Sequence, residues 1–175
     1  PTGNYISKAE VTHFLDSMRT LDLILVDESF IEFVDAESSP SALDLMFEYP
    51  NLMILKSLSK NYGIPGLRLG YAATGNVERI ASLRSDLPIW NINSLAQFFL
   101  EEFGAYHEEF TDSCRRVREA TLRLYKGLEE VPYLYPYPTQ GNFVLCWVLY
   151  GFTAQELAEA LFERSRILVN NCGSK

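Results

Sequence analysis

One lysine stands among residue types that bind phosphate. Lys60 comes shortly after Ser57 and next to Ser59, and Arg68 lies eight residues beyond the lysine. Hydroxyl groups donate hydrogen bonds to phosphate oxygens, and a guanidinium group can bind two such oxygens at once. An amine beside a phosphate site can act as a nucleophile when its surroundings favour the uncharged form. The segment therefore predicts a phosphate-binding site with a reactive lysine beside it.

A carboxylate lies at the end of a predicted strand earlier in the chain. Asp27, with Glu28 beside it, follows the short and mostly apolar run 21–26. In open α/β sheets, ligands bind outside the carboxyl ends of the strands. An acid there could bind a metal, act as a base or pair with a cationic ring nitrogen, although Asp is also a common turn former. Phosphate-binding groups, a reactive lysine and an acid for a ring nitrogen together describe a site for pyridoxal 5′-phosphate (PLP).

Short apolar runs alternate with helical patterns, which predicts an α/β fold. Such runs are typical of strands covered on both faces, as in a mostly parallel sheet. We expect the strands at residues 21–26, 51–55, 69–74, 142–149 and 167–170. Two of the helices begin with a capping box, at Ser7 and at Thr153. We expect helices at about residues 8–19, 77–84, 93–103, 106–129 and 154–164.

The composition limits the class of protein. A chain of 175 residues fits one domain or a domain and a half. Its 47% hydrophobic and 22% charged residues are ordinary for a soluble globular protein. The net charge of −8 disfavours nucleic-acid binding, and no apolar run is long enough to span a bilayer. Three cysteines without metal-ligand spacing favour a reduced, cytoplasmic setting, and no metal site is expected.

The lysine segment resembles that of fold-type-I PLP-dependent aminotransferases (class I/II), especially the histidinol-phosphate aminotransferase branch. The family pattern is Ser, two residues, Lys, and then Arg eight residues after the Lys, as in Ser57–Tyr71. Four further segments resemble the family in the same order along the chain. They are the end of an Asn-Pro-x-Gly turn at Pro1–Gly3, an Asp-Glu-Ala-Tyr-like strand end at Val26–Phe30, a segment near the subunit interface at Pro88–Gln97, and a small-domain strand near the substrate at Gln140–Val144.

The resemblance implies a role for each residue that matches the lysine pattern. Lys60 would hold PLP as an internal aldimine and later move the proton between Cα and C4′. Asp27 would keep the pyridine nitrogen protonated. Ser57 and Arg68 would bind the cofactor phosphate, with Ser59 as a helper.

Three more positions acquire expected roles from the resemblance. Phe30 adjoins the cofactor site where the family often has a Tyr that hydrogen-bonds the 3′-oxygen, so one donor is missing. Asn91, in the interface segment, could help complete the site of a neighbouring subunit, so a homodimer is expected. Asn142 would lie near the substrate.

The resemblance also divides the chain. Residues 1–128 would form part of the large PLP-binding domain of the aspartate-aminotransferase-like fold, including its long connecting helix. Residues 129–175 would begin the small α+β C-terminal domain. The family's glycine-rich phosphate turn and ring-stacking aromatic would lie upstream, and its carboxylate-binding Arg downstream. The chain is therefore expected to be a partial segment with little or no turnover by itself.

Three functions are compatible with these residues. The first is an aminotransferase of amino-acid metabolism that moves an amino group between an amino acid or amino-alcohol phosphate and a 2-oxo acid. The second is a PLP-dependent amino-acid decarboxylase similar to threonine-phosphate decarboxylase, which would use the same Lys60 and Asp27. The third is a non-catalytic aminotransferase-like module for dimerisation or regulation. The presence of Asp27, Lys60 and Arg68 at the family's spacing favours an enzyme.

Overall fold

The chain forms two compact units in the computed structural model, which describes residues 2–35 and 40–173. One unit comprises residues 5–118, and the other comprises residues 119–173 together with 2–4. The division falls within the long helix rather than after residue 128, so the boundary between a large and a small domain at 128/129 stays a prediction. Pro1 of the expected turn lies outside the described residues.

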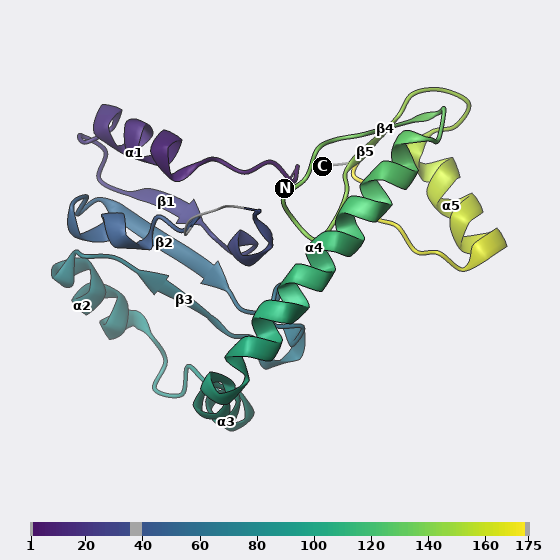
Figure 1. The fold of residues 1–175 in the computed structure, drawn as a ribbon. Helices are drawn as coiled ribbons and strands as arrows, with labels where there is room; N and C mark the ends of the chain where they lie inside the picture. Colours follow the sequence, from purple (N-terminus) through teal and green to yellow (C-terminus); the bar gives the residue numbers. More distant parts are fainter. Residues whose placement is uncertain (1, 36–39, 174–175) are drawn as a thin grey trace. The chain divides into compact units, whose positions relative to one another are not determined.

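A three-stranded sheet organises the first unit, in the order β1-β2-β3 (Figure 1). Strands β1 (Ile24–Asp27) and β2 (Leu52–Ser57) run parallel, whereas β3 (Gly70–Ala73) runs antiparallel to β2. The expected α/β class is confirmed, although these three strands include one parallel and one antiparallel pairing. Because parallel strands end at the same edge and an antiparallel neighbour begins there, the end of β1, the end of β2 and the start of β3 meet.

The core of this unit lies between the sheet and helix α1 (Lys8–Ser17). Leu15 of α1 packs with Leu52 and Ile54 of β2, and all three side chains are fully buried. The capping box at Ser7 is confirmed, since Glu10 N donates to the Ser7 hydroxyl and the Glu10 carboxylate accepts from Ser7 N. The α1 helix therefore begins where the sequence predicts.

The expectation of strands covered on both faces holds only for part of the sheet. Leu52, Met53 and Ile54 are buried in succession along β2, which is the central strand. On β1, however, Leu25 is 53% exposed, because α1 covers only the side on which Ile24 lies. The prediction of two covered faces is therefore wrong for β1 within the described chain.

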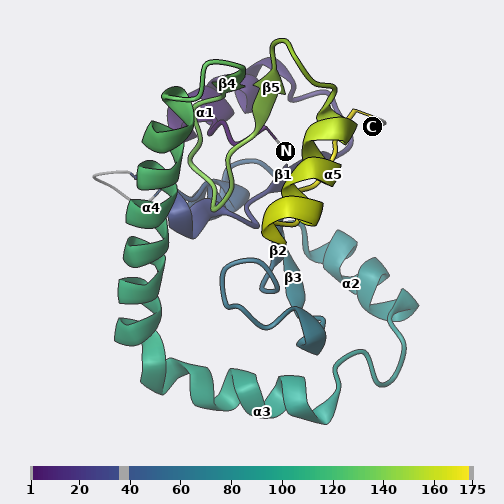
Figure 2. The same cartoon turned by 90° about the vertical axis from the view of Figure 1, so that its right-hand side faces the viewer.

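Three helices follow the sheet, and each begins within one residue of its predicted start. Asn76 and Asn93 accept hydrogen bonds from the first turns of the two shorter helices. Figure 2 shows α3 at the end of the unit away from α1, with a loop leading into it from α2. The helices are α2 (Val77–Asp86), α3 (Ser94–Phe103) and α4 (His107–Glu129), with short 3-10 turns at Ile31–Phe33, Leu43–Phe47, Pro65–Leu67 and Gly104–Tyr106.

The second unit contains a two-stranded antiparallel sheet and one helix. Strand β4 (Leu134–Pro136) pairs with β5 (Cys146–Val148), which is shorter than the predicted strand at 142–149. Helix α5 (Ala154–Ser165) begins with the predicted capping box at Thr153.

The strand expected at 167–170 does not form. Its backbone pairs with no strand of the described chain, and Leu168 is 84% exposed. An apolar run becomes a strand only when a partner satisfies its backbone groups. The prediction of a fifth strand from apolar character alone was therefore wrong.

No helix in the described stretches 2–35 and 40–173 has both the length and the apolar character needed to cross a bilayer.

Shortening one buried side chain of the central strand should test this core. We expect Ile54→Ala to lower the free energy of unfolding by about 2–5 kcal/mol, because it opens a cavity beside Leu15 and Leu52. Urea unfolding followed by circular dichroism would measure the change. The control is Val77→Ala, at a side chain that is 79% exposed, which should change the free energy by less than about 0.5 kcal/mol. Equal effects of the two changes would contradict the core described above.

Candidate functional site

Four of the predicted site residues line one hollow at the edge where the strands meet. They are Asp27 from β1, Ser57 from β2, and Ser59 and Arg68 from the connection between β2 and β3. The hollow is open to solvent and has a volume of about 350 Å³. The sheet brings the residues together because Ser57 pairs with Gly70, only two residues after Arg68, while β1 ends alongside β2.

The carboxylate of Asp27 is held by Ser29, which sequence reasoning did not single out. Asp27 Oδ1 accepts hydrogen bonds from the backbone N–H of Ser29 at 2.9 Å and from its hydroxyl at 2.5 Å. The same hydroxyl accepts from Ser57 N at 3.0 Å, so it links the ends of β1 and β2. The signal in the sequence is a hydroxyl residue where the Asp-Glu-Ala-Tyr pattern has Ala.

Glu28, in contrast, has a structural role. Its side chain is buried, with 4% exposed, and its two oxygens accept from the Ser41 hydroxyl and from Ala42 N, both at 2.7 Å. These contacts tie the segment after β1 to residues 41–42. The carboxylate available to a ligand in the hollow is therefore that of Asp27.

The backbone around Arg68 is bent sharply to reach the hollow. Arg68 has φ 56° and ψ 43°, a left-handed conformation that costs a non-glycine residue about 1–3 kcal/mol. Its guanidinium donates to Pro65 O at 3.1 Å. Gly70 allows the close approach of β3, since a Cβ there would lie 2.8 Å from Lys56 O. Strained residues of this kind concentrate at binding sites.

Lys60 lies in the turn that follows β2, directly after Ser59, and its side chain is exposed. It is adjacent in the chain to the hollow but is not among the residues that line it. Ser59 N donates to the Ser57 hydroxyl at 3.3 Å, which ties the start of the turn to the strand end. The lysine is therefore next in sequence to a residue of the site, and its role there stays a prediction.

A partly buried hydrogen-bond network holds the far side of the same turn. Glu32 accepts from Lys56 Nζ and from Asn61 Nδ2 through its two oxygens. The side chains of Lys56 and Glu32 are only 11% and 17% exposed. Removing one partner of a mostly desolvated ion pair leaves the other charge uncompensated and destabilises the fold. Because Asn61 follows Lys60, the network fixes the turn on which the lysine stands.

Tyr62 anchors the turn to the helices that follow. Its ring stacks on Phe110 of α4, with centroids 4.3 Å apart and an interplanar angle of 7°, and meets Phe103 edge-on at 4.6 Å. Burial, together with the negative charge of Glu32, raises the pKa of Tyr62 to about 12. Burial also raises the pKa of the nearby Cys114 thiol, so this side chain behaves as a packing residue rather than a nucleophile.

The other predicted site residues are not among those that line the hollow. Phe30 is half-buried and follows Ser29 directly, but it is not among the lining residues. Asn91 is exposed in the loop between α2 and α3, beside Ile89 and Trp90. Asn142 is exposed in the second unit, before β5. The structure thus brings together four of the predicted positions.

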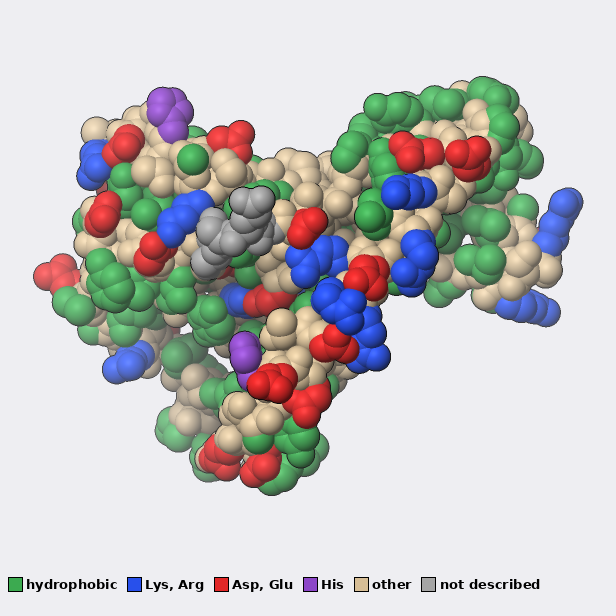
Figure 3. Space-filling model, viewed as in Figure 1, with side chains coloured by type: hydrophobic (Ala, Val, Ile, Leu, Met, Phe, Trp, Pro, Cys, Tyr) green, Lys and Arg blue, Asp and Glu red, His purple; other side chains and the backbone are tan. Residues whose placement is uncertain are grey.

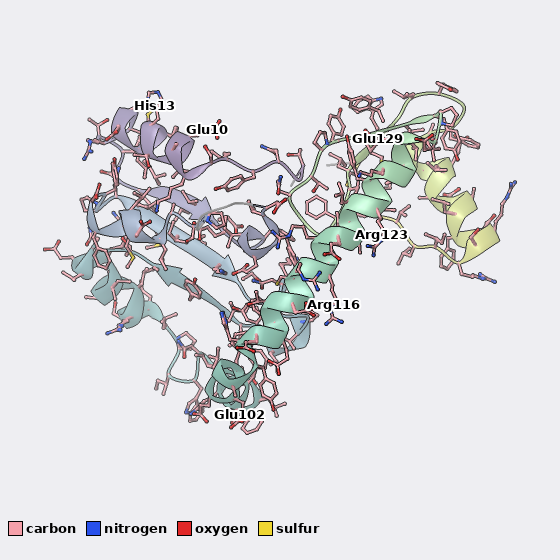
Figure 4. All side chains as sticks on the ribbon, viewed as in Figure 1. Glu10, His13, Glu102, Arg116, Arg123 and Glu129 are labelled. Carbon is pink, nitrogen blue, oxygen red and sulfur yellow. The ribbon has the colours of Figure 1, made fainter. Side chains whose placement is uncertain are left out.

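Three arginines stand close together on α4, at Arg115, Arg116 and Arg118, and acidic side chains of the same helix partly neutralise them. Figure 3 shows Lys and Arg side chains along α4 with acidic groups among them. Asp112 pairs with Arg115 at 2.6 Å and with Arg116 at 3.1 Å. In Figure 4 the labelled Arg116 projects outward from the helix. This pattern is typical of a solvated helix face.

The architecture described above is part of the PLP-dependent aminotransferase fold, as similar proteins establish. A solved decarboxylase from Sulfurospirillum multivorans superposes with a TM-score of 0.91 at 30% identity, covering all of this chain and 51% of that one. The family model for aminotransferase class I and II matches residues 1–174, and the chain belongs to this family. The resemblance found in the sequence is thereby confirmed, and the family uses PLP.

Two curated relatives carry more specific names. The CMP-5′-(3-aminopropyl)phosphonate synthase of Streptomyces rubellomurinus is 39% identical over 175 residues, which is 100% of this chain and 28% of that protein. The histidinol-phosphate aminotransferase of Bacillus pumilus is 34% identical over 168 residues, 96% of this chain and 45% of that protein. The chain therefore spans less than half the length of these relatives.

The raised pKa of Tyr62 should make stability fall in alkali. An unfolded tyrosine ionises near pH 10, whereas folded Tyr62 stays neutral up to about 12. Between these values the unfolded state loses a proton that the folded state keeps, so the free energy of unfolding decreases as pH rises. Tyr62→Phe should lose less stability over this range than the wild type does.

Urea unfolding at several pH values from 9 to about 11 would measure this difference. Tyr106→Phe, at an exposed tyrosine of the same unit, is the matched control and should follow the wild-type curve. Parallel curves for wild type and Tyr62→Phe would contradict the burial of the Tyr62 hydroxyl.

Proposed function

We propose that the whole protein is a PLP-dependent aminotransferase that transfers an amino group between an amino acid or amino-alcohol phosphate and a 2-oxo acid. The observation that carries this proposal is the shared hollow of Asp27, Ser57, Ser59 and Arg68, with Lys60 following the lining residue Ser59 in the chain. The types of donor and acceptor in this hollow fit the cofactor of the family.

The phosphate end of the cofactor fits the hydroxyl and guanidinium groups. Ser57 and Ser59 donate hydrogen bonds, and Arg68 supplies a positive charge with paired N–H groups. The left-handed backbone at Arg68 and the close approach at Gly70 hold these donors at the edge of the sheet. A preformed set of donors binds an anion without a large cost in conformational entropy.

Asp27 and Lys60 are the residues proposed to act in the reaction. The Asp27 carboxylate would pair with the ring nitrogen and keep it protonated. When bound, PLP withdraws electrons from the bonds around the substrate Cα. Lys60 would hold the cofactor through its side-chain amine, and once released from it would move a proton to or from the substrate Cα as acid and base.

The names of the relatives support a substrate that carries phosphorus. Histidinol phosphate and aminopropylphosphonate appear in the names of two curated relatives, and both pair an amine with a phosphorus oxyanion. We place Asn142 near the substrate on the basis of the family pattern alone. Phe30, which lacks the hydroxyl of the family's Tyr, would contact the cofactor region without donating a hydrogen bond.

Decarboxylation is the second candidate, and one observation favours it. The solved structure from Sulfurospirillum multivorans is described as a decarboxylase and is 30% identical to this chain. Both reactions would use Lys60 and Asp27, and they differ in which bond to Cα is broken. Product analysis separates them, since a decarboxylase releases carbon dioxide whereas an aminotransferase forms a new amino acid from an added 2-oxo acid.

We further propose a homodimer in a reduced, cytoplasmic setting, with the segment 88–97 at the interface. Ile89 and Trp90 are 95% and 92% exposed, although large apolar side chains seldom lie fully in water beside one another. Asn91 follows them and would reach the site of the neighbouring subunit. A second copy of this chain is the partner that the family pattern favours.

Replacing the lysine should test the enzyme proposal. We expect the full-length protein with PLP to show a visible absorption band, and Lys60→Ala to lose it because the covalent link is gone. Activity with an amino donor should fall by at least about a thousandfold, since this residue holds the cofactor and moves the proton. Lys8→Ala, at a lysine paired with Asp44 outside the hollow, is the control and should keep both.

A visible band that persists in Lys60→Ala would refute the assigned lysine. The complete absence of a band from the wild-type full-length protein would favour a non-catalytic module instead. The band need not appear in the present chain alone, which spans less than half of its curated relatives.

A change at the exposed apolar pair should test the dimer. We expect the double variant Ile89→Ser with Trp90→Ser to be monomeric, because it removes the two most exposed large apolar side chains of the interface segment. Sedimentation velocity on the full-length protein would measure this. Val77→Ser, at another exposed apolar residue of the same unit, should leave the dimer intact. A dimer that survives the double change would place the interface elsewhere.

A further inference from the structure

We propose that Ser29 is a positioning residue of the cofactor site and acts through Asp27. Its hydroxyl orients the carboxylate so that one oxygen, Oδ2, faces the ring nitrogen. This inference rests on the proposed function, because it assumes that Asp27 pairs with the ring nitrogen of PLP. Ser29 itself lines the hollow and is 7% exposed.

The direction of the hydrogen bonds around Ser29 follows from the donors available. The backbone N–H of Ser57 can only donate, so the Ser29 oxygen accepts from it at 3.0 Å. The hydroxyl proton is then donated to Asp27 Oδ1 at 2.5 Å. The chain of bonds thus runs from Ser57 N–H through the Ser29 hydroxyl to the carboxylate. Hydrogen bonds arranged in this way polarise and strengthen one another.

The same contacts decide which oxygen of Asp27 is free for a ligand. Both hydrogen bonds that Asp27 accepts within the described chain end on Oδ1, one from the Ser29 hydroxyl and one from Ser29 N. Oδ2 is left for a donor that enters the hollow. Holding one oxygen in place lowers the entropy lost when the other binds a ring N–H.

The anchor of this arrangement is the parallel pairing of β1 with β2. Asp27 pairs with Leu55, and the ladder continues one residue further, where Glu28 N donates to Leu55 O at 2.8 Å. This pairing brings the Ser29 hydroxyl within hydrogen-bond distance of Ser57 N on the neighbouring strand. The orientation of the carboxylate is set by the backbone of β2 rather than by a mobile side chain.

A thermodynamic cycle on the full-length protein would test the proposal, with pyridoxamine 5′-phosphate as the probe. This compound has the ring nitrogen and phosphate of PLP but needs no covalent link to Lys60. Calorimetry would give its dissociation constant for wild type, Ser29→Ala, Asp27→Ala and the double variant. Spectroscopic thermal unfolding of each would be recorded alongside.

We expect Ser29→Ala to weaken binding about three- to tenfold in the wild-type background, as for the net loss of one hydrogen bond. In the Asp27→Ala background the same change should weaken binding less than about twofold, because no carboxylate remains to be oriented. The matched control is Ser41→Ala, which also removes a serine-to-carboxylate hydrogen bond, to Glu28, but outside the hollow. It should leave the dissociation constant unchanged.

Each other outcome overturns the inference. An equal loss of affinity in both backgrounds would mean that Ser29 supports the fold without acting through Asp27. No loss in either background would mean that the carboxylate needs no such support. If the wild-type protein does not bind the probe at all, the proposed function fails together with this inference, whereas normal binding without a Ser29 effect removes the inference alone.

Discussion

The position of β2, between a parallel strand and an antiparallel one, is the constraint on which the rest of the site depends. The parallel partner β1 ends at the same edge as β2, and the antiparallel partner β3 starts there. Three stretches of chain that are separate in the sequence are therefore brought to one edge by backbone hydrogen bonds alone. A one-residue slip in either pairing would turn the side chains at that edge to the opposite face.

The connection between β2 and β3 is constrained at both ends, which explains how an exposed lysine can have a defined place. On one side Ser59 is tied to the end of β2. On the other, Asn61 joins the Glu32–Lys56 pair and Tyr62 enters an aromatic cluster with α3 and α4. The side chain of Lys60 is exposed to solvent while its backbone neighbours are held.

Sequence reasoning succeeded where the information is local and failed where it depends on pairing. The capping boxes at Ser7 and Thr153 were predictable because each requires only two residues three positions apart. The run at 167–170 looked like a strand, but nothing in its own residues reveals whether a partner strand exists. The link from Ser29 to Ser57 spans 28 residues and exists only in one register of β1 against β2. Contacts of this kind cannot be predicted until the pairing of the strands is known.

The left-handed backbone of Arg68 has a consequence for how this site can change over evolutionary time. Glycine would relieve the conformational strain at that position, yet it would remove the guanidinium from the hollow. If Arg68 binds an anion as proposed, selection for a more stable chain and selection for binding act in opposite directions at this residue. A lineage that abandoned the ligand would be free to accept glycine or asparagine there, so the residue at position 68 becomes a marker of whether binding is still under selection.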